Sequence, residues 1–297
     1  MQAKAFASSR ECETWSQVGT ATPDHVIRTK QKPLLLNLQQ WTDPDKLREE
    51  VSCKLNSYCE NYHRYFEANK SAKGVDKTEL DQLPRVLLVA GLGLVTIGKT
   101  VKETRISADI YQHTIDIIHK SFSVADYVPL DASDLFDMEY WSLEQAKIKK
   151  TKKLLEGNVV VITGSSGTIG FETYKMFKSY GAEVILLDFN REKLKELQSN
   201  IKDTCIYCDV TNKKSVEKTF NQICKKFGGV DILISNAGTA PSGTIGEVSD
   251  DVLRKSFEVN FFSHQNCASE AVKIMKKQNI NGCLLFNISN QSVNPGI

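Results

Sequence analysis

Residues 159–170 read VVVITGSSGTIG, an apolar run that leads directly into a glycine-rich turn. The five residues from Val159 to Thr163 are all β-branched and do not alternate with polar residues, which favours a strand covered on both faces. The segment that follows, up to Gly181, has the spacing of an amphipathic helix. A strand, a glycine-rich turn and a helix in this order predict the opening of a βαβ unit.

The turn has the composition of an anion-binding loop. Gly164 permits a tight turn, and Gly167 and Gly170 allow the backbone and the helix to come close together. Free N–H groups at the start of the helix, with the helix dipole behind them, favour a pyrophosphate. An ordinary strand–helix turn is the alternative reading of the glycines.

The next strand supports the dinucleotide reading. It ends in Asp188, 18 residues after Gly170, where an acid can accept hydrogen bonds from the ribose hydroxyls of an adenosine. An acid at this point also repels a 2′-phosphate, which favours NAD over NADP. Arg191 argues the other way, because a nearby arginine can accept that phosphate, but its place three residues beyond the strand gives Asp188 more weight.

Short apolar runs and amphipathic segments alternate through the rest of residues 155–297. The strands are predicted at 158–164, 182–188, 203–210, 230–238 and 282–289, and the helices at 170–181, 191–201, 213–228 and 250–278. This alternation predicts an α/β fold with a doubly wound parallel sheet, a Rossmann-type arrangement with helices on both faces. Residues 155–297 would form one domain.

The chain divides near residue 150, where residues 147–153 hold five lysines in seven positions. A solvated helix end and linker is favoured over a nucleic-acid or lipid patch, because no aromatic residues interleave with the lysines. Residues 1–150 are predicted as a separate α+β domain. It would contain long helices over 43–69, capped by Asp43 or Asp45, and over 101–122, with paired strands within 85–98.

Composition limits the classes of function. The chain has 297 residues, of which 41% are apolar and 25% charged, with a net charge of +2. This balance gives no electrostatic reason to expect nucleic acid or a membrane as a partner. The eight cysteines are scattered, which suggests reduced thiols in a cytoplasm, and the Cys205 and Cys208 pair fits simple packing better than a metal or redox site.

Four further motifs follow the glycine-rich turn in order: CDV at 208–210, SNAG at 235–238, FEVN at 257–260 and NIS at 287–289. Together they resemble the short-chain dehydrogenase/reductase family, and the resemblance runs from residue 157 to the end. It implies an NAD-dependent oxidoreductase. Asn260 and Ser289 match catalytic positions of that family, the serine being the residue that hydrogen-bonds the substrate oxygen.

The resemblance also implies a cofactor site. Asp209 would hold the adenine amino group, with Val210 beside the ring, and Ile169 would lie by the nicotinamide. Thr168 stands where the family loop has its middle glycine, which changes the expected geometry of the pyrophosphate contact. The residues implied to bind the cofactor are Gly164, Ser166, Gly167, Thr168, Ile169, Gly170, Asp188, Asp209, Val210, Asn236, Ala237 and Gly238.

The family's proton donor, a tyrosine followed four residues later by a lysine, comes after the serine that Ser289 matches. The eight residues after Ser289 contain no such pair. Tyr174 and Lys178 have the spacing but lie in the first helix, where surface or packing roles are expected. The sequence is therefore expected to be a truncated reading frame that ends at an open sheet edge, inactive as it stands and able at most to bind NAD.

Residues 1–150, joined to the dehydrogenase half, resemble part of the bifunctional class II aldolase/short-chain dehydrogenase proteins, which are tied to deoxy-sugar breakdown. Those aldolases use zinc held by histidines, but Leu92 stands where one ligand would be, and no metal site is predicted. His25 could bind a substrate phosphate with Arg28 and Lys30, although a structured loop is the preferred reading.

The predicted function is hydride transfer between NAD and a hydroxyl or carbonyl of a small sugar-derived substrate. An aldolase-type lyase activity of the first half and a non-catalytic NAD-binding module are the alternatives. The intact protein would be cytoplasmic and a homo-oligomer, with a small molecule as its partner.

Overall fold

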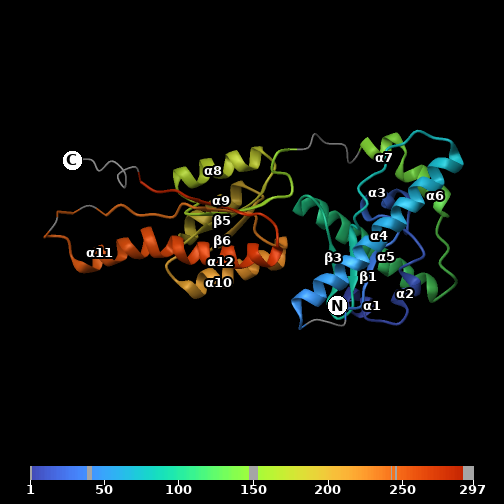
Figure 1. Cartoon of the computed structure of the whole chain (residues 1–297), viewed down its shortest axis with the longest axis horizontal. Coiled ribbons are helices and arrows are strands. Elements are labelled where there is room, and N and C mark those ends of the chain that lie inside the picture. The colour runs from blue at the N-terminus through green and yellow to red at the C-terminus, as the bar shows by residue number, and fades with distance from the viewer. Residues whose placement is uncertain (1, 39–41, 147–152, 242, 245, 290–297) are drawn as a thin grey trace. The chain divides into compact units, whose positions relative to one another are not determined.

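The computed structural model describes residues 2–38, 42–146, 153–241, 243–244 and 246–289. The chain separates into two compact units, Met1–Thr151 and Lys152–Ile297, which are described in turn (Figure 1). The lysine-rich segment that was predicted to end a helix, residues 147–152, lies outside the described residues. Within the described ranges, no helix is both long and apolar enough to cross a membrane.

The first unit packs helices around a small mixed sheet. Strand β2 pairs in parallel with β1 and antiparallel with β3, so the order is β1-β2-β3. The strands are β1 (Leu34–Leu36), β2 (Val86–Val89) and β3 (Gly93–Thr96). The helices are α1 (Gln2–Ala7), α2 (Cys12–Trp15), η1 (Pro23–His25), α3 (Val26–Thr29), α4 (Pro44–Lys73), α5 (Val101–Phe122), α6 (Ala132–Glu139) and α7 (Ser142–Ala146).

The long helix α4 is defined at both ends by the sequence. Its cap is Asp43, whose carboxylate accepts hydrogen bonds from the backbone N–H groups of Asp45 and Lys46. Of the two acids that could have capped it, the structure therefore uses Asp43. Pro44 occupies the first helical position, and Gly74 ends the helix in the left-handed conformation.

The central strand β2 is buried on both sides. Val86 and Leu88 pack with Ile115 of α5, whereas Leu87 packs in a second cluster with Leu34 and other residues of β1 and with α4. Alternate residues of one strand thus hold two helical layers.

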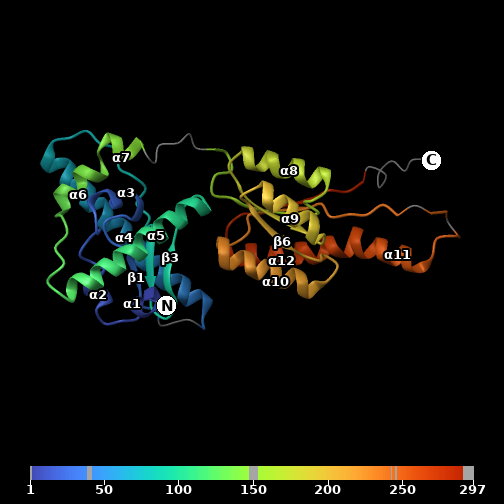
Figure 2. The same cartoon turned by 180° about the vertical axis from the view of Figure 1, so that it is seen from behind.

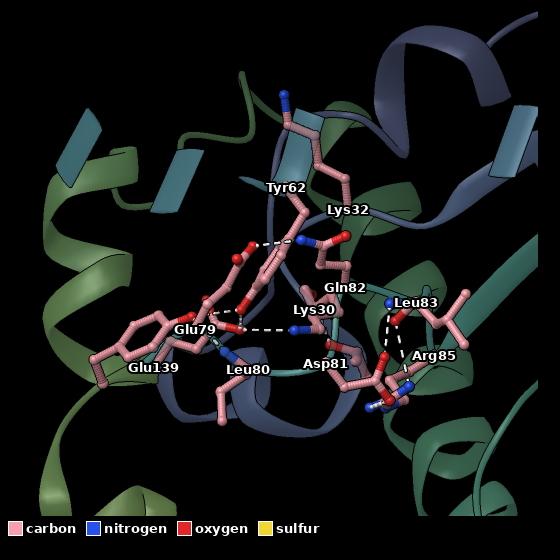
Figure 3. Close-up of polar contacts among 12 residues, drawn as sticks. Lys30, Lys32, Tyr62, Glu79, Leu80, Asp81, Gln82, Leu83, Arg85 and Glu139 are labelled. Carbon is pink, nitrogen blue, oxygen red and sulfur yellow. Dashed lines mark hydrogen bonds and ion pairs between the residues drawn. The ribbon is translucent and has the colours of Figure 1, made fainter. Parts of the chain in front are cut away.

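A buried polar cluster joins α3, α4 and α6 (Figure 3). The Nζ of Lys30 lies 3.4 Å from Oε1 of Glu139 and 3.6 Å from the centre of the Tyr62 ring. The Tyr62 hydroxyl donates to the same Oε1 at 2.9 Å and shares a hydrogen bond with the Tyr140 hydroxyl. Burial lowers the pKa of Lys30 to about 8 and raises the pKa of Glu139.

The second unit is a five-stranded parallel sheet in the order β6-β5-β4-β7-β8. Its strands are β4 (Val159–Thr163), β5 (Glu183–Asp188), β6 (Thr204–Tyr207), β7 (Ile232–Ser235) and β8 (Cys283–Phe286). Its helices are α8 (Thr168–Ser179), α9 (Arg191–Asn200), α10 (Lys213–Phe227), α11 (Asp250–Phe257), the π-helical η2 (Glu258–Phe262) and α12 (Ser263–Gln278). In chain order the strands run 3-2-1-4-5.

Helices cover both faces of this sheet, as the doubly wound prediction requires (Figures 1 and 2). On one face Val161 packs with Phe220 of α10 and Ala271 of α12. On the other face Val160 packs with Tyr174 of α8. The two faces thus use neighbouring residues of one strand, which explains why β4 has no polar alternation.

Two features of the second unit differ from or refine the sequence reading. The helix predicted as continuous over 250–278 contains the π-helical turn η2, next to which the Ser263 hydroxyl donates to the carbonyl of Val259. Cys205 and Cys208 pack in different hydrophobic clusters on opposite sides of the sheet, and both thiols are free.

The buried pair in the first unit gives a stability prediction. Replacing Glu139 by leucine leaves the Lys30 ammonium buried without its carboxylate, and we expect the free energy of unfolding to fall by about 3–5 kcal/mol. All three tryptophans of the chain, Trp15, Trp41 and Trp141, lie in the first unit. Urea unfolding followed by tryptophan fluorescence therefore reports on this unit.

Asp137 is the matched control, because it lies on the same helix and pairs with Lys73 at an exposed position. Asp137→Ala should lower the free energy of unfolding by less than about 1 kcal/mol. Equal losses of unfolding free energy in the Glu139→Leu and Asp137→Ala variants would contradict the assignment of Lys30 and Glu139 as a stabilising buried ion pair.

Candidate functional site

The carboxyl ends of four parallel strands, β4, β5, β6 and β7, meet at a cleft of about 1030 Å³. Open parallel sheets bind ligands at this edge. All the residues predicted to bind a cofactor line this one cleft: Gly164, Ser166, Gly167, Thr168, Ile169, Gly170, Asp188, Asp209, Val210, Asn236, Ala237 and Gly238. Their role in binding stays a prediction, but the chain does bring them together.

The turn between β4 and α8 leaves no space for side chains at two of its glycines. Gly164 has a φ of +61°, and a Cβ there would lie 2.8 Å from the Cα of Ala237. A Cβ on Gly170 would collide with the carbonyl oxygen of Gly164 and would lie 2.8 Å from the Cα of Ser165. Gly167 has an ordinary φ of −80°, so close approach is required at Gly164 and Gly170 rather than at Gly167.

The start of α8 faces this cleft with its backbone donors available. Gly167 is the N-cap residue and has no side chain that could bond the N–H groups of the first turn. Thr168, which stands in place of the expected glycine, is the first helical residue and lines the cleft. A cradle too tight for a Cβ, next to a helix N-terminus without a side-chain cap, fits a pyrophosphate.

Asp188 fixes the glycine-rich turn to the next strand. Its Oδ2 accepts hydrogen bonds from the N–H of Ser166 at 2.9 Å and from the Ser166 hydroxyl at 2.7 Å. Its Oδ1 accepts from the N–H of Asn190 at 3.0 Å. The carboxylate is therefore buried and oriented by hydrogen bonds to both of its oxygens, while it still borders the cleft.

Arg191, the residue that could accept a 2′-phosphate, is stacked on an aromatic residue of the cleft. The guanidinium of Arg191 lies 3.6 Å from the centre of the Tyr207 ring, in stacking contact. Tyr207 lines the cleft and pairs in register with Asp188, whereas Arg191 is not among the lining residues. The basic residue of α9 that does line the cleft is Lys193.

The backbone at the end of β7 is hydrogen-bonded to the end of β4. The N–H groups of Asn236 and Ala237 both donate to the Oγ1 of Thr163, at 2.9 and 3.0 Å. The Asn236 side chain donates to the carbonyls of Thr163 and Gly164 and accepts from Asn287 of the next strand end. This network holds the floor of the cleft without any charged group.

Asn260 and Ser289, the two predicted catalytic residues, are not among the residues that line the cleft. The Asn260 amide donates to the carbonyl of Thr239 at 2.8 Å and accepts from the N–H of Thr239 at 2.9 Å. Asn260 thus holds a loop that lines the cleft. Ser289 follows the lining residue Asn287 by two positions, and the catalytic roles of both residues stay predictions.

The alternative Tyr-x-x-x-Lys pair has a structural role. The buried Tyr174 donates its hydroxyl to Asp203 at 2.8 Å, and Lys178 forms an ion pair with the same carboxylate. Burial raises the pKa of Tyr174 above its ordinary value, so its hydroxyl stays protonated. Neither residue lines the cleft.

The phosphate site considered at His25, Arg28 and Lys30 is not formed. Lys30 is buried and engaged with Glu139, so its ammonium does not face a ligand (Figure 3). Leu92, at the position where the aldolase resemblance places a histidine, is exposed in the turn between β2 and β3. Among the described residues, no group of three or more His, Cys, Asp or Glu side chains could hold a metal ion.

Sequence reasoning missed several lining residues. Register could have found Tyr207, which lies opposite Asp188, and the NIS motif could have indicated Asn287. Several others directly adjoin predicted residues at the strand ends. Lys193 comes from α9, and four more come from the helical segment after β7, which no motif connects to the cleft. The lining residues that were not predicted are Phe189, Asn190, Lys193, Tyr207, Cys208, Thr211, Thr239, Pro241, Val252, Lys255, Ser256, Val259 and Asn287.

Two protein-family models match the chain. Residues 1–148 match the model described as aldolase class II, second domain, and residues 158–297 match the short chain dehydrogenase model. Both the architecture and the order of the halves agree with the resemblance seen in the sequence.

Individual proteins are similar to the whole chain or to its second half. The uncharacterized oxidoreductase YuxG of Bacillus subtilis (strain 168) is 30% identical over 98% of this chain and 43% of its own length. The short chain aldehyde dehydrogenase 1 of Euphorbia lathyris is 36% identical over 48% of this chain and 51% of its length. The chain spans about half the length of the curated relatives it matches.

A solved structure titled NAD+-bound xylitol dehydrogenase is 25% identical, with a TM-score of 0.45, and covers 50% of this chain and 57% of its own.

The glycine geometry predicts which substitution the turn tolerates. Gly170→Ala pushes a methyl group into the backbone of Gly164, and we expect the second unit to lose about 1–3 kcal/mol of stability. Gly167→Ala places its methyl group 3.4 Å from the same carbonyl oxygen, at an ordinary φ, and should cost no more than about 1 kcal/mol.

Hydrogen exchange of the β4 and β5 amides measures both variants. Equal protection in the two variants, or a larger loss for Gly167→Ala, would contradict the close approach at Gly170.

Proposed function

Because residues 158–297 belong to the short-chain dehydrogenase family and follow an aldolase class II second domain, we propose that the protein is an NAD-dependent oxidoreductase. It would transfer a hydride between the nicotinamide and a hydroxyl or carbonyl group of a small sugar-derived substrate. The same family assignment makes a nicotinamide dinucleotide the cofactor class.

The observation that carries the proposal is the cleft at the ends of β4 to β7. It combines a backbone cradle that excludes a Cβ at Gly164 and Gly170 with a helix N-terminus and a buried acid, Asp188. The first two parts suit a pyrophosphate, and the acid suits a free ribose 2′-hydroxyl better than a 2′-phosphate. Its volume of about 1030 Å³ suits a large ligand.

The bound nicotinamide would supply the hydride donor or acceptor. Asp188 would accept from the adenosine ribose while it keeps the glycine-rich turn in place through Ser166. Asn260 would position the Thr239 loop through its two backbone hydrogen bonds. Ser289 would donate a hydrogen bond to the substrate oxygen, as its match to the family serine implies.

A second candidate is NAD binding without turnover. It rests on the chemistry of the two residues that match catalytic positions of the family. Asn260 and Ser289 can position and polarise, but neither takes up a proton near neutral pH. A binding assay on this chain therefore tests the cofactor site independently of hydride transfer.

The substrate class, the compartment and the assembly remain parts of the proposal. The sugar-derived substrate rests on the pairing of the two halves. A cytoplasmic location is supported by eight free cysteines. We propose a homo-oligomer that acts on a small molecule and has neither a nucleic acid nor a membrane as partner.

Calorimetric titration with NAD and with NADP, on the 297-residue chain, tests the proposal. We expect NAD to bind and NADP to bind at least about tenfold more weakly, because the Asp188 carboxylate repels a 2′-phosphate. Tighter binding of NADP would overturn the choice of cofactor, and binding of neither would overturn the proposed function.

A substitution at Asp188 separates charge from hydrogen bonding. Asp188→Asn keeps an acceptor for Ser166 but removes the negative charge, so the preference for NAD over NADP should fall by about tenfold. Glu192→Gln removes one charge from the exposed first turn of α9, outside the cleft, and should leave the preference unchanged. A change of equal size in both variants would show only a general effect of net charge.

A further inference from the structure

A histidine outside the predicted site is bonded to the strand that carries part of it. The Nδ1 of His264 and the Oγ of Ser235 are 2.7 Å apart, in a buried hydrogen bond. Ser235 is the last residue of β7, directly before Asn236, Ala237 and Gly238, which line the cleft. His264 is the second residue of α12, just after the π-helical turn.

This bond is one of two ties between the same helix and the same loop. Asn260 bonds the backbone of Thr239 in both directions. His264, four residues later in the sequence, bonds Ser235, which is the last residue of β7 and lies four residues before Thr239. The two ties therefore hold both ends of the segment 236–238.

His264 also contacts the neighbouring strand. Its ring meets the ring of Phe286 edge-on, with 6.0 Å between the centres. Phe286 precedes Asn287, whose N–H donates to the carbonyl of Ser235 and whose side chain bonds Asn236. One imidazole thus touches the ends of both β7 and β8, next to the Asn236 side of the cleft.

We propose that His264 is a positioning residue of the dinucleotide cleft, which in its neutral form holds the 236–238 segment in the arrangement that binds the nucleotide. The inference rests on the proposed function, because it concerns the affinity of that cleft. It adds a proton-sensitive element to the Asn236 side of the cleft, where the other ties are made by backbone groups, amides and the Thr163 hydroxyl.

Protonation of His264 should weaken the tie, because the proposal makes the neutral Nδ1 the acceptor of the Ser235 hydroxyl, and an imidazolium has no lone pair there to accept a hydrogen bond. Burial lowers the pKa of His264 below the ordinary 6.5. The groups packed against the ring, Ser235 and Phe286, do not titrate near neutral pH and offer no charge to an imidazolium. Above pH 6.5 the hydrogen bond between His264 and Ser235 is fully formed. As the pH falls below 6.5, the proton binds preferentially to the state in which this bond is broken, so that state becomes more populated.

The test measures NAD affinity of the 297-residue chain by calorimetry between pH 5.5 and 7.5. His264 is the sole histidine of residues 152–297, so a step in this range reports on it. We expect NAD to bind the unsubstituted chain progressively more weakly as the pH falls. His264→Leu and Ser235→Ala should bind about three- to tenfold more weakly at pH 7.5, from the lost hydrogen bond, and show little pH dependence.

His264→Asn is the conservative variant, since its amide can replace Nδ1 as a partner of Ser235 without titrating. It should bind NAD within about twofold of the unsubstituted chain at pH 7.5 and lack the step at lower pH. A merely structural role would weaken all variants alike and leave the pH dependence in place. That outcome, or a flat profile in the unsubstituted chain, would overturn the inference.

An NMR titration of the His264 ring protons needs no substitution that could prevent folding. The pKa should lie below 6.5, and saturating NAD should lower it further, because a ligand that favours the neutral tie must disfavour the proton to the same extent. Unchanged titration with NAD bound would overturn the inference while leaving the proposed function intact. Failure of the unsubstituted chain to bind NAD would overturn both.

Discussion

The site of the second unit depends on one steric constraint, the contact between Gly170 of α8 and the carbonyl of Gly164. The helix begins so close to the end of β4 that a Cβ on Gly170 would not fit between them. The same turn is held from two sides, by Asp188 of β5 through Ser166 and by Asn236, which directly follows β7. Three strand ends are thus fixed relative to one helix N-terminus, and a cleft for an anion follows from that arrangement.

Much of this unit was predictable because its signals are local. The β-branched run of β4, the glycines and the acid at the end of β5 each specify a backbone state or a buried position in their own vicinity. The alternation of strands and helices predicted a doubly wound parallel sheet, and the five strands are indeed parallel with helices on both faces. Two finer predictions differ from the structure. Of the two glycines predicted to allow close approach, only Gly170 leaves no room for a Cβ, and the helix predicted over 250–278 contains a π-helical turn.

The first unit was harder to predict, for physical reasons. Its strand β1 has only three residues, and each pairs with a residue of β2 that lies 53 positions later, so neither length nor local pattern identifies the strand. Lys30 was considered, with His25 and Arg28, as a ligand of a substrate phosphate, although a structured loop was the preferred interpretation. Its actual partner, Glu139, lies 109 positions later, and no local pattern relates the two. Lys30 also has a φ of +64°, a conformation that is uncommon for lysine and that the local sequence does not predict.

The two units use their polar groups in opposite ways. In the first, Lys30, Tyr62 and Glu139 bond one another inside the core, so the two charged groups pair with each other and do not face a ligand. In the second, the Asp188 carboxylate holds the glycine-rich turn, and backbone groups, amides and hydroxyls hold the Asn236 side of the cleft. On the Asn236 side, proton sensitivity enters through a titrating residue behind the lining segment. The bond between His264 and Ser235 lies at that position, one residue before the segment that lines the cleft.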